Sequence, residues 1–196
     1  MMTRLMQILT LNLFCWLCTT HLHSQAFCAL RDPLQTIRTS FPEADGFASS
    51  VVTFSPKQAA ALTSESGLSV DPREFGQHTI YSVTRQGKLL GYAQSRSELS
   101  DWGIAEIVCT FTSDLKVLDF HFQRCREPNR ASVESDSFRT LVRGRTEAEL
   151  VLVLKTLESG SSKTRESGDL LATVVKALIK SAIVHRLSFS RSADLP

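Results

Sequence analysis

The chain has 196 residues, and its 22 basic side chains nearly balance its 20 acidic ones. This balance argues against a nucleic-acid-binding protein, in which a clear excess of basic residues is expected. The apolar fraction of 42% is ordinary for a globular protein and predicts a folded domain.

The first 26 residues have the pattern of a secretory signal peptide. Arg4 precedes a short apolar run from Leu5 to Cys18, and Ser24-Gln25-Ala26 fits a small-x-small cleavage site before Phe27. The run is shorter than the roughly 20 apolar residues that cross a bilayer. We therefore expect an exported protein, periplasmic or otherwise extracytoplasmic. An uncleaved, membrane-associated N-terminal anchor is the alternative.

The remaining chain is expected to form one domain over residues 27–187, followed by a loose tail over 188–196. It keeps three cysteines, Cys28, Cys109 and Cys125, and contains no C-x-x-C pair. Three cysteines are too few for a disulfide framework, and the missing pair argues against a zinc site or a thioredoxin-like site.

The first half of the domain is predicted to contain two short helices followed by strands. Apolar residues at helical spacing predict a helix from Leu30 that ends at Phe41, before Pro42. Ser55-Pro56 predicts the start of a second short helix over 57–63. Strands are expected over 79–85 and 89–95. Gly91 in the second of these strands indicates a close backbone approach or a bulge.

The clearest hairpin joins strands over 104–112 and 115–123. With Ser113-Asp114 as a two-residue turn, three pairs share the core face: Ala105 with Phe122, Ile107 with Phe120 and Cys109 with Leu118. In this register Glu106 faces His121 as a charge pair. Cys125 then points away from Cys109, so a disulfide between them is not expected unless a bulge intervenes.

Helices dominate the second half. A helical turn is expected over 138–142, ending at Gly144. Thr146 and Glu149 form a capping box that predicts a helix through Leu157, although 149–155 could equally be a buried strand. After a polar loop over 159–167, a last helix is expected over 170–187, with Lys180 and His185 near its C-terminal end to suit the helix dipole. The predicted fold is therefore α+β, an antiparallel sheet with helices packed on one face.

Motifs for hydrolysis or metal binding are weak. The chain has no G-x-S-x-G and no acidic metal loop, so no catalytic or metal-binding residue is predicted. A small hydrolase would need a reactive Cys28 or Cys109. A local concentration of arginines forms either a solvated loop or an anion-facing rim; its members are Arg124, Arg126, Arg130, Arg139, Arg143 and Arg145.

Several segments occur in an order that resembles the FMN-binding domain family, which includes the flavin-bearing periplasmic subunits of the ion-pumping quinone reductase and of the Rnf electron-transport complex. The resemblance spans roughly Asp32 to Leu187. The matching segments are Phe41-Pro42-Glu43-Ala44, Leu89-Leu90-Gly91-Tyr92-Ala93, Trp102-Gly103-Ile104, Glu127-Pro128, Phe138 to Gly144, and Ser167-Gly168 before the last helix.

The resemblance implies an electron-transfer flavoprotein or oxidoreductase subunit. Ser167, Gly168 and Thr173 would surround the FMN phosphate, because free amides and the helix dipole attract anions at a helix start. The ring side would be formed by the residues Tyr92, Trp102 and Glu127. The partner would be a redox protein or a membrane electron-transport subunit.

The signature at the helix start departs from the family. After Ser167-Gly168 the chain reads Asp-Leu-Leu-Ala-Thr, where the family has Ala-Thr-x-Thr/Ser. The position for covalent attachment falls on Ala172, so any FMN is expected to be bound non-covalently. The alternative is a cofactor-free, exported interaction module that keeps the same fold.

Overall fold

The computed structural model describes residues 31–56, 60, 63–64, 68, 76–160 and 165–193, without the side chains of 160, 165–169 and 189–193. The expected signal peptide, Cys28 and most of the expected helix at 57–63 lie outside these residues. Five strands are present: β1 (Gly46–Thr53), β2 (Gln77–Arg85), β3 (Lys88–Ser100), β4 (Gly103–Thr112) and β5 (Val117–Arg124). The helices are α2 (Leu34–Ser40), α4 (Arg130–Val133), α5 (Asp136–Val142), α6 (Glu147–Gly160) and α7 (Arg165–Ala193).

The five strands form one antiparallel sheet in the order β1-β2-β3-β4-β5, so each strand pairs with its neighbours in sequence. The α+β class predicted from sequence is confirmed. Helices α4 to α7 all contribute to the larger core cluster on one face of the sheet. The short helix α2 packs on the opposite face, where Ile37 and Phe41 contact a smaller cluster with Val83, Ala93 and Val108.

Gly91 lies where the predicted close approach and bulge both occur. The pairing of β2 with β3 shifts between Val83 and Thr84, which leaves Leu90 as the extra residue. A Cβ atom on Gly91 would lie 2.1 Å from the carbonyl oxygen of Phe111 and 2.9 Å from the ring of Phe41. Only glycine fits here, because the neighbouring strand and α2 both approach this point of the backbone.

The predicted register of the β4–β5 hairpin is wrong by two residues. Cys109 pairs with Phe120 and Ile107 with Phe122, because the connection is longer than two residues and contains Leu115 at φ 60°. A bulge at Leu118 turns that side chain toward the smaller core cluster instead of the larger one.

Two further consequences of the predicted register are also wrong. Glu106 lies opposite Arg124 rather than His121. A second bulge, at Gln123, turns Cys125 toward the larger core, which also contains Cys109. Both thiols are nevertheless free, as predicted.

The segment from 149 to 155 is helical. The capping box at the start of α6 is present, since the Thr146 amide donates to Glu149 Oε2 at 2.8 Å and the Glu149 amide donates to Thr146 Oγ at 3.5 Å. The predicted turn at 138–142 is α5, which is followed by Gly144 at φ 73°.

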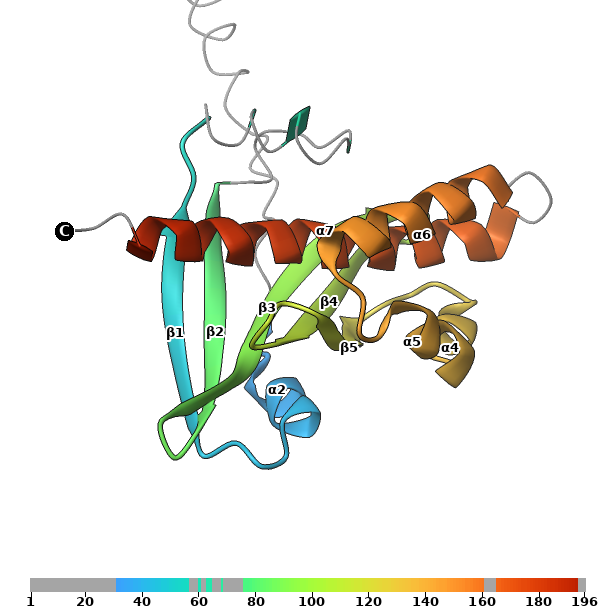
Figure 1. The fold of residues 1–196 in the computed structure, drawn as a ribbon. Helices are drawn as coiled ribbons and strands as arrows, with labels where there is room; N and C mark the ends of the chain where they lie inside the picture. Colours follow the sequence, from blue (N-terminus) through green and yellow to red (C-terminus); the bar gives the residue numbers. More distant parts are fainter. Residues whose placement is uncertain are drawn as a thin grey trace, which may run out of the picture.

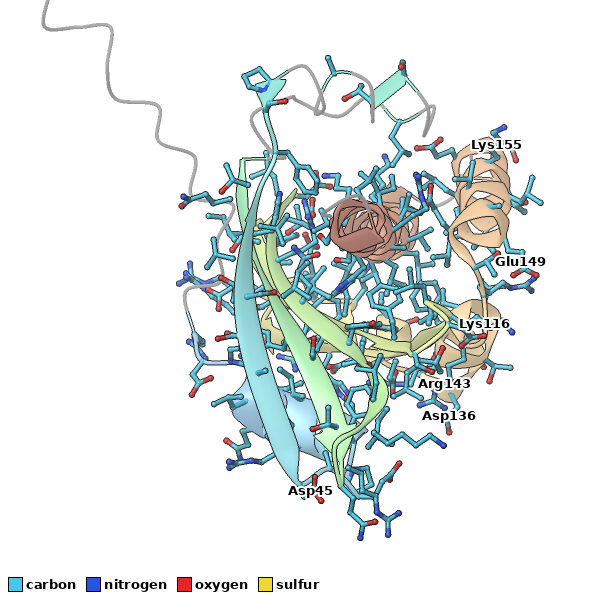
Figure 2. The ribbon with its side chains drawn as sticks, turned by 60° about the vertical axis from the view of Figure 1, so that its left-hand side comes forward. Asp45, Lys116, Asp136, Arg143, Glu149 and Lys155 are labelled. Carbon is cyan, nitrogen blue, oxygen red and sulfur yellow. The ribbon has the colours of Figure 1, made fainter. Side chains whose placement is uncertain are left out.

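Helix α7 occupies the centre of the molecule. It crosses the sheet beside α6 (Figure 1). In Figure 2, which looks nearly along the axis of α7, side chains of the sheet lie on one side and α6 on the other. It is longer at both ends than the predicted 170–187, since it begins at Arg165 and continues to Ala193, past the start of the predicted tail. From Leu170 to His185 almost every side chain is buried, so the single apolar face predicted for this helix is too narrow.

Candidate functional site

Ser167 and Gly168 lie in the first turn of α7 rather than before it, because the helix begins at Arg165. The first four amide N–H groups of a helix have no partner within the helix, so 165–168 present donors that favour an anion. Glu166 and Asp169 place negative charge in or beside the same turn. That charge stabilises the helix start but opposes a phosphate group.

The residues that follow are part of the protein interior. Ala172 is 6% exposed and belongs to the larger core cluster, and Thr173 is 8% exposed. The position that would carry a covalent flavin is therefore a buried methyl group. This arrangement does not fit covalent FMN attachment.

Trp102 and Glu127 are brought together by the fold. The backbone N–H of Trp102 donates to Glu127 Oε1 at 3.1 Å, which ties the β3–β4 turn to the connection between β5 and α4. Glu127 is 8% exposed, whereas the indole of Trp102 is 60% exposed. The carboxylate thus positions the turn, and the indole remains available to a partner.

Tyr92 lies far from Trp102 and Glu127. It lies eight residues before the end of β3 at Ser100, which is roughly 26 Å of extended strand, and Trp102 follows in the turn beyond that end. Its ring packs beside that of His185, with 5.3 Å between centroids, and burial raises the pKa of its hydroxyl. A single flavin ring cannot contact both Tyr92 and Trp102.

A buried charged cluster between β3 and α7 was missed in the sequence. Glu98 accepts hydrogen bonds from Arg96 Nε and from Lys180 Nζ, each at 2.8 Å, and all three side chains are at least nine-tenths buried. Burial raises the pKa of Glu98, but the attraction of Arg96 and Lys180 outweighs it, so the net pKa is lowered. Lys180 therefore forms an ion pair with Glu98. Its predicted interaction with the helix dipole is wrong, because α7 continues to Ala193.

The sequence carries a signal for this cluster, because its polar residues on β3 occupy every second position. Gln94, Arg96 and Glu98 alternate along β3, and their strand continues the core face that begins at Tyr92. Such alternation is usually read as the solvent face of a strand. Only the position of α7 shows that this polar row points inward.

Two groups that could act as nucleophile or base are held inactive by burial. Burial raises the pKa of Cys109 to about 12, so its thiol stays protonated. Burial and the nearby His78 lower the pKa of His185 to about 3, so its imidazole stays neutral. His185 is fully buried against Tyr92 and Phe111, and its predicted role at the helix dipole is wrong.

The arginine concentration is largely neutralised within the protein. Arg139 and Arg143 both bind the Asp119 carboxylate, and Arg130 binds Glu134 at 3.0 Å. Burial raises the pKa of Asp119, but its hydrogen bonds with Arg143 and the Phe120 amide, together with the charge of Arg139, lower the net value. These pairings favour a structural role over an anion-facing rim.

Three exposed large apolar side chains lie at one end of the sheet, whereas Val51, Leu141 and Leu152 are exposed elsewhere. Leu99 is 78% exposed and Ile104 43%, and the two residues pair directly across the β3–β4 hairpin, with the exposed Trp102 in the turn. We call these three residues the hairpin patch. A second apolar feature is a hollow of about 260 Å³ on α5 and α6, lined by Leu141, Arg145, Glu149, Leu152, Val153, Thr156 and Leu157.

Within the described part of the chain, no three His, Cys, Asp or Glu side chains are grouped so that they could hold a metal ion. Among the same residues no helix is long and apolar enough to cross a membrane. Comparison with known proteins finds no matching family model, curated protein or solved structure.

Proposed function

We propose that this chain is an exported interaction module without a bound flavin, and that it contacts its partner through the hairpin patch. The observation that carries the proposal is the contrast at the residues that resemble a flavin site. Tyr92, Glu127 and Thr173 are each more than nine-tenths buried, whereas Trp102 is largely exposed beside Leu99 and Ile104.

The interior supports the same proposal. The three charged groups beneath α7, Arg96, Glu98 and Lys180, are buried and paired with one another, so they offer no open site to a substrate. A group of neighbouring exposed apolar side chains is typical of a contact surface, whereas single exposed apolar side chains are normal on the surface of a monomer.

Photocrosslinking in cells of the source organism tests the contact surface. A benzophenone amino acid is incorporated in place of Trp102 and, as a matched control, in place of Val51, which is 66% exposed on β1. We expect an adduct of defined mass, with protein or with lipid, from position 102 that is absent from position 51. Equal labelling at both positions, or none at 102, would contradict a contact at the patch.

Non-covalent FMN binding is the second candidate. It is favoured by one observation, the exposed indole held beside Glu127 by a backbone hydrogen bond. An indole face can stack on a flat aromatic ring, and the unpaired amides at the start of α7 would favour a phosphate. The electron donor or acceptor would then be a redox protein or a membrane electron-transport subunit.

An absorbance spectrum and a titration separate the two candidates. If the cofactor-free proposal is correct, the visible spectrum of the purified chain has no flavin absorbance band, and the chain does not quench the fluorescence of added FMN. Saturable quenching that is lost in Trp102→Ala would instead establish the flavin candidate.

A further inference from the structure

We propose that the hairpin patch docks on the surface of a lipid bilayer. This inference rests on the proposed interaction function and deepens it, since it names the class of partner that the same three residues contact. Three features of the described residues support a lipid surface: the rigid presentation of the patch, its small size, and the place where the N-terminal segment joins the domain.

The patch is presented by a well-ordered turn. Ser100 Oγ donates to the carbonyl oxygen of Gly103 at 2.8 Å, and Gly103 adopts φ 103°. The Trp102 amide is held by Glu127, and Leu99 lies directly opposite Ile104 in the ladder. The apolar side chains are therefore positioned before any partner arrives, and little conformational entropy is lost when they are buried.

The size of the patch favours lipid over protein. A stable protein interface involves about 20–30 residues on each side, whereas this patch has three at the end of a hairpin. A second copy of the chain would bury too few residues here to form a stable dimer. A bilayer requires no complementary shape, and its interfacial region is where tryptophan side chains are enriched.

The N-terminal segment joins the domain beside the patch. Arg31 Nε lies 3.8 Å from Glu106 Oε2, and Arg31 Nη1 donates to the carbonyl oxygen of Gln123 at 3.2 Å. Glu106 follows Ile104 by two residues on the same face of β4, about 7 Å along the strand. The first 30 residues, which include the apolar run from Leu5 to Cys18, therefore connect to the domain at its patch end.

Charges near the patch largely cancel. Glu106 is buried between Arg31 and Arg124, with each N–O distance at 3.8 Å. The exposed Arg126 and Asp101 have opposite charges. Apolar insertion, rather than attraction to anionic headgroups, must then dominate, so we expect binding to depend weakly on salt and on the fraction of anionic lipid.

Tryptophan fluorescence of the full chain tests the inference. Trp16→Phe leaves Trp102 as the only tryptophan. With phosphatidylcholine vesicles, with or without phosphatidylglycerol, we expect a blue shift of the Trp102 emission and quenching by brominated lipid. Leu99→Ser combined with Ile104→Ser should lower the partition coefficient at least about tenfold, whereas Val51→Ser, also at an exposed apolar residue, should leave it within about twofold.

Each other result overturns the lipid assignment. Emission that is neither shifted nor quenched while the chain sediments with the vesicles means that another segment binds lipid. A blue shift without vesicles assigns the patch to the chain's own N-terminal segment if it is independent of concentration, or to a second copy if it grows with concentration. A protein adduct at position 102 in cells, without lipid quenching, would remove the lipid inference but retain the proposed interaction function.

Discussion

Glu98→Gln tests whether the buried charged cluster stabilises the fold. The change removes the negative charge that lies 2.8 Å from both Arg96 Nε and Lys180 Nζ. Removing one partner of a buried ion pair costs about 3–5 kcal/mol, because the remaining charge stays desolvated without compensation. With a urea m-value of about 2 kcal/mol/M, the midpoint of unfolding should fall by about 1.5–2.5 M.

The assay is urea unfolding followed by circular dichroism, with two further variants. Glu158→Gln is the matched control, because Glu158 also binds a lysine of α7, Lys176, at 3.0 Å, but both of these side chains are exposed to solvent. Its midpoint should scarcely change. Adding Lys180→Met to Glu98→Gln should recover part of the loss, because one of the two uncompensated cations is then removed.

The pH dependence supplies an independent check on the same cluster. The pKa of Glu98 is lowered in the folded protein, so its stabilisation is present above the unfolded pKa of about 4.3 and is lost as the pH falls through the folded value. Glu98→Gln should lack this component of acid destabilisation. A midpoint within about 0.5 M of the wild type, or no recovery with Lys180→Met, would refute the assigned role.

Two further predictions concern buried positions near α7 and β3. His185→Phe should reduce the loss of stability that occurs as the pH falls from about 6.5 to 3. The folded pKa of His185, about 3, lies below the unfolded value, so in this window the unfolded chain binds one more proton than the folded chain. The free energy of unfolding of the wild type therefore falls by up to about 1.4 kcal/mol for each unit by which the pH is lowered. Urea unfolding at a series of pH values measures this slope, and an unchanged slope would show that His185 is not the group responsible. Gly91→Ala should destabilise the fold by about 3 kcal/mol or more, because its Cβ would clash with the Phe111 carbonyl. The control Gly87→Ala, at φ 75° with open space around it, should cost about 1–2 kcal/mol. Equal losses of stability for the two variants in thermal unfolding would contradict the clash.

The amino-acid sequence by itself determined the local features of this protein. The end of α2 before Pro42, the capping box of α6 and the special role of Gly91 each depend on the chemistry of a few neighbouring residues, and all three are observed. The α+β class also followed, because alternation in the middle of the chain and helical spacing in the second half are periodic over many residues.

Only the tertiary structure decided where the polar residues point. The hairpin register depends on two bulges, at Leu118 and Gln123, whose cost is balanced by packing on both faces of the sheet. Arg96, Glu98 and Lys180 have the sequence pattern of solvent-facing residues, and they are buried because α7 lies across the sheet above them (Figure 1). The predicted flavin residues were separated for the same reason: Tyr92 lies beneath α7, whereas Trp102 is exposed at the far end of β3.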